Sequence, residues 1–432
     1  MRALLLGSGR AVLHDTLQSM IGPGSSLRAC RLRRAHFKPG RKLTGYYDVT
    51  VEGDAHSTPI AVMWFFDGAP ATGPELLATE QRLQGATKAS GFDRLFATVA
   101  SWRMLVQVAP FDPAFPSLGY LSDPRRVSEA QAACGGPSRR AAGPCGVRPI
   151  RYRPGQRHLL EYRGPRGRSI FAKLYRRGEA CRVADVVSAL GDLLDAAEVQ
   201  GVRVVRPAAV WAETDAILYR QALGTPLSRG LRAGQPIDLV QLRKIGRLLR
   251  ALHSSTQADD SQLPERNLEN EISAINRACE AMRALRPEFG AAAARVLERS
   301  RERLTVLEQE PHTVVHGDMK ADHLLVGPEG IIVLDADRCA RADPAPDLGK
   351  LLADLRWWSW VSSRPYPILV EAEMLAGYGD AGPRVARARL YAALLLVKMA
   401  ARRIPVASRD WAGRTADLLA LASRAVDEGA AR

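Results

Sequence analysis

Residues 314–350, VVHGDMKADHLLVGPEGIIVLDADRCARADPAPDLGK, are the stretch from which the fold can be worked out. An apolar pair leads into Asp318, and two short apolar runs, Leu324–Val326 and Ile331–Leu334, follow on either side of the sequence GPEG. Glycine and proline at this spacing predict a turn, so that the two runs pair as an antiparallel hairpin. The returning strand ends at Asp335. The sequence therefore predicts that two carboxylates, those of Asp318 and Asp335, converge on one point.

Two converging acids on loops beside a hairpin suit magnesium-dependent phosphoryl transfer. In that reaction one carboxylate orients the attacking hydroxyl, and the other holds the metal that bridges the phosphates. Asp318 is the candidate for the first role and Asp335 for the second. An isolated Asp in such a loop is more often a solvated turn residue, but the ordered string of motifs favours the chemical interpretation.

The ordered motifs resemble those of the aminoglycoside phosphotransferase and choline kinase-like superfamily, which is related to the protein kinases. They are HGD, a polar residue five positions after its Asp, then LD, DP and DL. The resemblance implies that Asp318 is the catalytic base and that His323 and Asp335 bind magnesium or manganese. It also implies that Asp347 braces the catalytic loop, a role that we extend to His316. ATP or GTP is the implied phosphoryl donor.

His323 departs from this family, which usually has Asn at that position and Gln in some branches. Imidazole can bind a divalent ion, whereas magnesium prefers oxygen ligands. Two interpretations stay open: neutral His323 binds the metal, or it only hydrogen-bonds Asp318 while Asp335 holds the metal together with Asp337. Lys320 is a second catalytic candidate, because related kinases carry a lysine here that touches the transferred phosphoryl group. The alternative for Lys320 is an exposed loop lysine.

An internal similarity predicts that a small antiparallel sheet is present twice. The sequence FKPGR at 37–41 is similar to YRPGQ at 152–156, and Tyr47 corresponds to Tyr162 at the same offset. The two copies differ inside the next apolar strand, where the first has Met63 and the second has Lys173. This pattern indicates a degenerate first copy followed by a functional one.

Lys173 is the predicted phosphate-binding lysine, because a buried ammonium requires an anionic partner. In kinase-like folds the lysine of the third strand contacts the nucleotide phosphates and pairs with an acid on the next helix. That helix is predicted over 179–199. Asp185 is the preferred partner, because the first copy has an acid at the same spacing, and Asp192 and Glu179 stay open. An edge-strand lysine that reaches solvent is the alternative.

The sequence QALGTPL at 221–227 resembles the hinge of the family, whose backbone hydrogen-bonds adenine, so Gln221 and Leu223 are assigned to the nucleotide. The alternative is a simple interdomain connector. Strands are predicted over 202–211 and 216–220 before this hinge. Apolar residues at intervals of three and four then predict helices. Their ranges are 238–253, 268–285, 289–307, 348–360, 368–378, 385–403 and 411–426.

Composition excludes several classes of protein. The chain of 432 residues contains no apolar run long enough to span a membrane, and its six cysteines lack CxxC pairs, which fits reduced thiols in a cytoplasm. The net charge of +15 comes from basic residues spread along the chain, which argues against a nucleic-acid partner. An anionic nucleotide or an anionic second substrate explains this charge more simply.

We therefore predict an α+β, protein-kinase-like bilobal fold with an antiparallel-sheet small lobe and a mainly helical large lobe. The predicted domains are a degenerate small lobe over 1–133, a linker over 134–146, a small lobe over 147–222 and a large lobe over 223–432. The predicted function is phosphoryl transfer to a hydroxyl of a small molecule, and the alternative is a catalytically silent nucleotide-binding or scaffold protein. A neutral or anionic acceptor is favoured, because the helical lobe has no evident acidic cluster.

Overall fold

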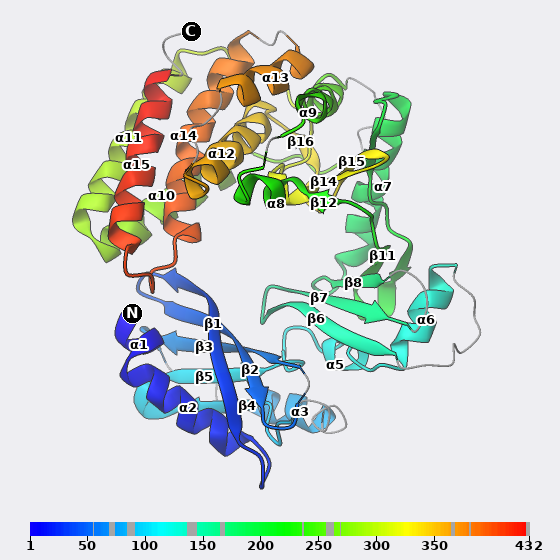
Figure 1. Cartoon of the computed structure of the whole chain (residues 1–432), viewed down its shortest axis with the longest axis vertical. Helices are drawn as coiled ribbons and strands as arrows, with labels where there is room; N and C mark the ends of the chain where they lie inside the picture. The colour runs from blue at the N-terminus through cyan, green and yellow to red at the C-terminus, as the bar shows by residue number, and fades with distance from the viewer. Residues whose placement is uncertain are drawn as a thin grey trace. The chain divides into compact units, whose positions relative to one another are not determined.

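The computed structural model contains two compact units (Figure 1). It describes residues 1–54, 56–68, 74–83, 91–135, 145–164, 169–235, 237–255, 263–267, 269–363, 368–379 and 382–428. Unit 1 comprises residues 1–182, 207–221 and 405–409, and unit 2 comprises residues 183–206, 222–404 and 410–432. Antiparallel sheets and many helices confirm the predicted α+β class.

The first sheet of unit 1 has five antiparallel strands in the order β1-β2-β3-β5-β4. The strands are β1 (Leu27–Lys38), β2 (Lys42–Val51), β3 (Thr58–Phe65), β4 (Phe96–Val99) and β5 (Met104–Val108). Helix α2 (Ser8–Met20) packs against this sheet. Its side chains Leu13, Leu17 and Met20 are buried in one core with apolar side chains of the strands. Short helices α1 (Arg2–Leu6) and α3 (Pro74–Arg82) complete this part of the chain.

The second sheet of unit 1 has the same strand order, β6-β7-β8-β11-β10. Its strands are β6 (Gly146–Arg153), β7 (Arg157–Arg163), β8 (Ile170–Leu174), β10 (Ala209–Trp211) and β11 (Ala216–Arg220). Tyr47 pairs with Ile60 in the first sheet, and Tyr162 pairs with Ile170 in the second. The strand registers thus place Met63 and Lys173 at equivalent positions. That the two sheets arose by duplication stays a prediction.

One core joins the two sheets. Residues 109–134, which include α5 (Leu118–Leu121) and α6 (Arg126–Ala133), supply apolar side chains that pack with those of the second sheet. Tyr162 donates a hydrogen bond to the carbonyl oxygen of Leu121 at 2.7 Å. The buried Asp112 accepts one from the backbone N–H of Gly155 at 2.8 Å. The predicted N-terminal domain over 1–133 therefore lies in unit 1, together with residues 147–182 and 207–221 of the predicted small lobe, whereas residues 183–206 of that lobe belong to unit 2. Residues 136–144 of the predicted linker are outside the described residues.

The predicted strand over 202–211 is wrong as a single element. It consists of β9 (Val202–Val204), which pairs with a strand of unit 2, and β10, which belongs to unit 1. Pro207 lies between them and has no N–H to donate to a ladder. Arg206 makes ion pairs with Asp192 and Asp195, each at 2.5 Å, which fix the chain at the end of β9.

Unit 2 is mainly helical. Its helices occur within a few residues of the predicted bounds, except for a short helix over Leu227–Arg232 that was not predicted. They are α7 (Ala180–Ala196), which begins in unit 1, α8 (Leu227–Arg232), α9 (Leu239–His253), α10 (Glu269–Leu285), α11 (Pro287–Thr305), α12 (Ala345–Val361), α13 (Ile368–Tyr378), α14 (Pro383–Arg403) and α15 (Trp411–Glu428). Asp238 caps α9 by accepting a hydrogen bond from the N–H of Val240 at 2.9 Å. Helix α12 packs against α14, and α9 packs against α13.

Two small sheets in unit 2 carry most of residues 314–350, which we call the catalytic stretch because they contain the predicted catalytic residues. Strands β12 (Thr225–Pro226), β14 (Leu324–Gly327), β15 (Gly330–Val333) and β9 form one sheet in the order β12-β14-β15-β9. Strands β13 (Thr313–Val315) and β16 (Ala340–Ala342) form the other. The antiparallel β14–β15 pair confirms the predicted hairpin.

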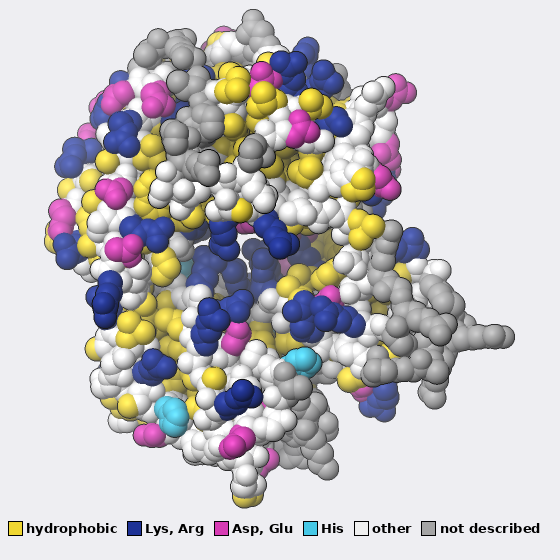
Figure 2. All heavy atoms as spheres, viewed as in Figure 1, with side chains coloured by type: hydrophobic (Ala, Val, Ile, Leu, Met, Phe, Trp, Pro, Cys, Tyr) yellow, Lys and Arg dark blue, Asp and Glu magenta, His cyan; other side chains and the backbone are white. Residues whose placement is uncertain are grey.

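The structure also shows where the charged side chains and the cysteines lie. Lys and Arg side chains are spread over the face shown in Figure 2. All six cysteines are described, and none of them forms a disulfide. Within the described part of the chain, no helix combines the length and apolar character needed to cross a membrane.

Close packing of α9 on α13 gives a first prediction. A Cβ atom on Gly246 would lie 2.0 Å from the carbonyl oxygen of Met374, so Gly246→Ala forces the two helices apart. We expect a loss of about 1–3 kcal/mol in the free energy of unfolding, measured by urea denaturation. Gly413→Ala on α15 is the matched control, because nothing lies within 4 Å of the added methyl group. It should stabilise the helix by up to about 1 kcal/mol, and equal effects of the two changes would contradict the packing described here.

Candidate active site

The catalytic stretch enters the site from β13 and leaves it through β16, which are paired antiparallel. Between them lie a loop, the one-turn 3₁₀ helix η4 (Ala321–His323) and the β14–β15 hairpin. Gly317 has a positive φ of 73°, and a Cβ atom there would lie 2.2 Å from the carbonyl oxygen of Arg338. Only glycine fits this position, which explains the middle residue of the HGD motif.

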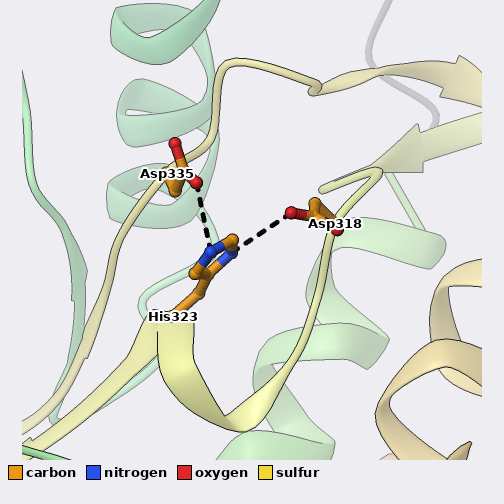
Figure 3. Close-up of side chains that lie close together, drawn as sticks. All are labelled: Asp318, His323 and Asp335. Carbon is orange, nitrogen blue, oxygen red and sulfur yellow. Dashed lines mark ion pairs between the residues drawn. The ribbon is translucent and has the colours of Figure 1, made fainter. Parts of the chain in front are cut away.

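Asp318, His323 and Asp335 form the centre of the site (Figure 3). One ligand atom from each residue lies within 4.8 Å of the other two. His323 Nε2 is 3.1 Å from an Asp335 carboxylate oxygen, and His323 Nδ1 is 3.8 Å from Asp318. Asp335 has a positive φ of 60°, an uncommon conformation that turns its carboxylate out of the strand. Two oxygen donors and one nitrogen donor therefore converge, as the sequence predicted.

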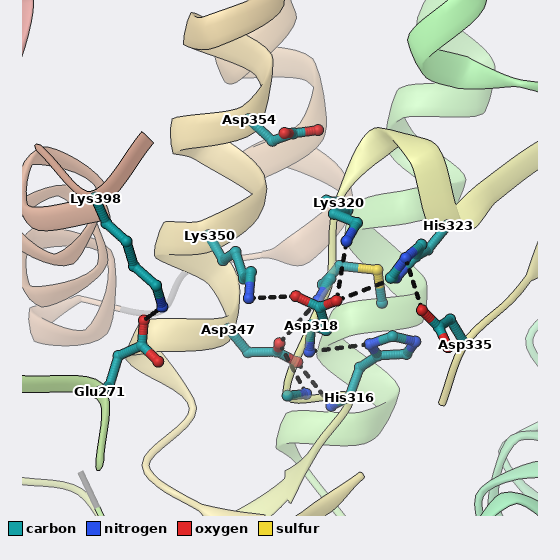
Figure 4. Close-up of polar contacts among 12 residues, drawn as sticks. Glu271, His316, Asp318, Lys320, His323, Asp335, Asp347, Lys350, Asp354 and Lys398 are labelled. Carbon is teal, nitrogen blue, oxygen red and sulfur yellow. Dashed lines mark hydrogen bonds and ion pairs between the residues drawn. The ribbon is translucent and has the colours of Figure 1, made fainter. Parts of the chain in front are cut away.

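Two lysines flank the carboxylate of Asp318 (Figure 4). Lys320 Nζ is 3.0 Å from Oδ2, and Lys350 Nζ contacts Oδ1. Burial alone would raise the pKa of Asp318, but Lys350, Lys320 and His323 together hold this pKa well below its ordinary range. Asp318 is thus ionised at neutral pH. It can accept a hydrogen bond from an acceptor hydroxyl throughout the physiological range.

The side chain of Asp347 contacts the backbone of the loop that precedes and follows Asp318. Its carboxylate accepts hydrogen bonds from the N–H groups of His316 at 2.7 Å, Gly317 at 3.1 Å and Met319 at 3.4 Å. His253 lies 3.7 Å from the same carboxylate. Burial would raise the pKa of Asp347, but these donors lower it, so the fully buried group stays ionised.

His316 links the loop to the hairpin and lies fully buried. Its Nε2 donates to the carbonyl oxygen of Leu334 at 3.0 Å, and its Nδ1 accepts from the N–H of Asp318 at 3.2 Å. Both bonds require a neutral imidazole with its proton on Nε2. Burial lowers the pKa of His316 in agreement with this state. His316 therefore joins the residues before Asp318 to the residue before Asp335.

Three residues that contact the site were not predicted. Asp354 is fully buried and accepts a hydrogen bond from the N–H of Ala321 at 2.8 Å. Lys350 contacts Asp318, and His253 faces Asp347. The spacing of Asp347, Lys350 and Asp354 on one helix is the signal that could have revealed two of them. Positions three and seven apart lie on one face of a helix.

The predicted nucleotide residues are distributed over both units. Lys173 and Gln221 belong to unit 1, whereas Asp185 and Leu223 belong to unit 2. Lys173 Nζ lies 5.6 Å from the ring centroid of Tyr175. The backbone N–H of Gln221 donates to the carbonyl oxygen of Ser169 at 2.9 Å, and its side-chain oxygen accepts from the N–H of Ser169 at 3.0 Å. Their roles towards a nucleotide stay predictions.

The remaining metal candidate, Asp337, is half-buried and lies two residues beyond Asp335. Among the described residues, the group of potential ligands consists of Asp318, His323 and Asp335 without it. Asp318 therefore lies beside the two residues that the sequence predicted as metal ligands, His323 and Asp335. The geometry leaves Asp337 outside the cluster.

Comparison with known proteins identifies one matching family. The sequence model described as "Phosphotransferase enzyme family" matches residues 157–391, more than half of the chain. This range contains Lys173 and the whole candidate active site. It confirms the family that the motifs predicted. No curated protein matches the chain.

Several solved structures are similar to this chain at low sequence identity. A choline/ethanolamine kinase family protein from Mesorhizobium loti has a TM-score of 0.45 and 19% identity, covering 70% of this chain and 98% of its own. The GDP complex of aminoglycoside 2'-phosphotransferase-IIIa has a TM-score of 0.42 and 16% identity, covering 65% and 92%. Amicoumacin kinase hAmiN in complex with AMP-PNP, Ca²⁺ and Ami has a TM-score of 0.44 and 13% identity, covering 64% and 88%.

The bracing role of Asp347 gives a second prediction. Asp347→Ala leaves buried N–H groups without an acceptor, so we expect a loss of about 3–5 kcal/mol in the free energy of unfolding. Asp347→Asn keeps one acceptor oxygen and should lose about half as much. Asp417→Ala, at an exposed position on α15, is the control. The measurement is the urea midpoint followed by tryptophan fluorescence, and identical midpoints for Asp347→Ala and the control would rule out this role.

Proposed function

Because this chain belongs to the phosphotransferase enzyme family, we propose that it transfers the γ-phosphoryl group of ATP or GTP to a hydroxyl of a small molecule. One observation carries the proposal: a buried loop and a hairpin bring the ligand atoms of Asp318, His323 and Asp335 within 4.8 Å of one another. Asp347 and Asp354, and not these two carboxylates, accept the described hydrogen bonds from the loop backbone. Phosphoryl transfer requires the two carboxylates, because one acid must orient the acceptor and another must hold the metal.

The donor set fits a divalent metal ion. Two carboxylates offer oxygen ligands and His323 offers nitrogen, and the Nδ1 atom of His323 is buried without a hydrogen-bond partner among the described residues. We propose that Asp335 and His323 hold the ion. Mg²⁺ or Mn²⁺ there would neutralise charge on the phosphates of the bound nucleotide. A nitrogen ligand favours manganese relative to the oxygen ligands that the family usually presents.

Asp318 is the residue that we assign to the acceptor. Because Lys320 and Lys350 keep its carboxylate ionised, Asp318 acts mainly by accepting the hydrogen bond of the attacking hydroxyl and fixing its direction. Full proton transfer follows as the new P–O bond forms. We also propose that Lys320, which contacts Asp318, touches the transferred phosphoryl group.

We propose the nucleotide-binding roles that the sequence predicted. Lys173 is proposed to contact the nucleotide phosphates with Asp185 as its acidic partner, and residues 221–223 to contact the base. The hydrogen bonds between Gln221 and Ser169 occupy the backbone N–H of Gln221. The carbonyl oxygen of Gln221 and the backbone of the half-exposed Leu223 are therefore the groups proposed to meet the base.

A third prediction tests the function directly. ATP and GTP turnover are measured with Mg²⁺ against a panel of alcohols for the wild-type chain and for Asp318→Asn. Loss of the orienting carboxylate should lower turnover by about 10²–10⁴-fold while nucleotide binding persists. Asp335→Ala should instead abolish magnesium-dependent nucleotide binding, with circular dichroism unchanged. Asp322→Ala, an exposed neighbour on η4, is the control for both changes.

The same measurements distinguish the alternative function. A silent nucleotide-binding or scaffold protein would bind ATP in a manner that needs Asp335 but would show no turnover with any acceptor, and Asp318→Asn would change nothing. That outcome would contradict the proposed phosphoryl transfer. Binding of nucleotide that is indifferent to Asp335 would contradict the metal assignment as well.

A fourth prediction concerns His323. His323→Asn replaces a nitrogen ligand with an oxygen ligand, so the ratio of apparent dissociation constants for Mn²⁺ and Mg²⁺ should move in favour of Mg²⁺. We expect a change of about tenfold in this ratio, equivalent to about 1.4 kcal/mol. The measurement is a nucleotide-binding titration with each metal. An unchanged ratio would show that His323 positions Asp335 without binding the metal.

A further inference from the structure

A cavity of about 410 Å³ opens beside the catalytic loop within unit 2. Gly317, which precedes Asp318, lines this cavity. Lys350, whose ammonium contacts the Asp318 carboxylate, lines it as well. A molecule bound in the cavity would therefore lie next to the carboxylate that we assign to the acceptor hydroxyl.

Cationic side chains dominate the wall of this cavity. Its described lining residues include six cations and three carboxylates. The cations are Arg266, Arg277, Arg338, Lys350, Lys398 and Arg402. They come from helices α10, α12 and α14 and from two loops, so segments that are far apart in the sequence each bring positive charge to one place. Such a wall favours the binding of an anion.

The carboxylates of the wall already have partners. Glu271 forms an ion pair with Lys398 (Figure 4), and Asp343 forms one with Arg387. Asp347 is occupied by the backbone N–H groups of the catalytic loop. Among the described lining residues, no carboxylate is thus left to receive a cationic acceptor. This distribution is the reverse of what binding a polyamine or a quaternary amine would require.

The cations of the wall repel one another. Burial, and then the neighbouring Arg338, lower the pKa of Arg266. Burial likewise lowers the pKa of Lys398 to about 8, and Lys350 and Arg402 contribute to this shift. Positive charges held together at this cost are stabilised when an anion enters between them.

Arg266 is fixed beside the catalytic loop. Its backbone N–H donates to the carbonyl oxygen of Arg341 at 2.9 Å. The backbone N–H of Arg341 in turn donates to the carbonyl oxygen of Pro264 at 3.0 Å. A Cβ atom on Gly317 would lie 3.2 Å from Arg266 Nη1, so this guanidinium lies against the loop backbone. It is half-buried, whereas Arg338 is exposed. Arg266 thus lies next to the catalytic loop, and Arg338 is the more accessible of the two to solvent.

We infer that the acceptor is an alcohol bearing an anionic group, a carboxylate or a phosphate, that binds in this cavity through Arg266 and Arg338. This inference rests on the proposed phosphoryl transfer and adds the class of acceptor. Guanidinium groups match both anions because they donate two parallel hydrogen bonds. The acceptor oxygen forms a bond to the γ-phosphorus while the bond from that phosphorus to the bridging oxygen breaks. The nucleoside diphosphate leaves, and the hydroxyl proton passes to Asp318 and then to solvent.

A fifth prediction tests the anion site without any turnover. Inorganic phosphate is titrated into the full chain by calorimetry at constant ionic strength, with chloride as the reference anion. We expect Arg266→Gln and Arg338→Gln each to raise the dissociation constant for phosphate by about tenfold, and Arg424→Gln, an exposed change on α15, to leave it unchanged. Absence of phosphate binding, or equal affinity in all variants, would overturn the inference.

A second arm uses matched alcohols as acceptors: glycerol, glycerate, glycerol 3-phosphate and choline. An anionic member should raise ATP consumption at least about tenfold above glycerol, and Arg338→Gln should raise its KM more than it lowers kcat. If glycerate reacts faster than glycerol 3-phosphate, the acceptor bears a carboxylate, and the opposite order indicates a phosphate. Faster reaction with glycerol or choline would overturn the inference and leave the proposed function intact. Phosphate binding that needs both arginines, without turnover of any acceptor, would support the anion site and contradict the proposed function.

Discussion

The carboxylate of Asp347 is the group on which the geometry of the catalytic loop depends. It accepts hydrogen bonds from the backbone N–H groups of His316, Gly317 and Met319, which could not otherwise be buried without a large cost. Because these bonds fix the backbone, Gly317 is held in its left-handed conformation and Asp318 is directed towards His323. Asp354 repeats the arrangement two helical turns later by accepting from Ala321. One helix therefore positions a loop that contributes the reacting groups.

Opposite charges are segregated within a short distance at this site. The carboxylates of Asp318 and Asp335 meet at the imidazole of His323, while Lys320 and Lys350 face Asp318 from another direction. The lysines keep the carboxylate ionised and create a boundary between an acidic cluster suited to a cation and a basic wall suited to an anion. This division gives the two substrates of a transfer reaction separate electrostatic environments.

Local patterns in the sequence predicted the parts of this structure that depend on local interactions. The hairpin before Asp335 follows from its turn residues, and the helices of unit 2 follow from apolar periodicity. Contacts between elements could not be predicted in this way. Helical spacing places Lys350 on the same face as Asp347, but it does not specify that Lys350 contacts Asp318 across a helix–loop interface. Strands β4 and β5 were missed because their pairing is set by the sheet that they join. The division at Pro207 was missed because the apolar residues on both sides favour one strand.

The N-terminal region and the second sheet of unit 1 share one core, so neither buries the apolar side chains of this core alone. Residues 109–134 cover the face of the second sheet, with Phe115 and Leu121 buried against it, and Tyr162 is tied to this cover by a hydrogen bond. The contact resembles the interface of an obligate dimer, in which neither partner has a stable solvated surface of its own. The second sheet therefore depends on residues 109–134 for the burial of its apolar face. A chain that began at residue 157, where the family match begins, would lack both this cover and strand β6.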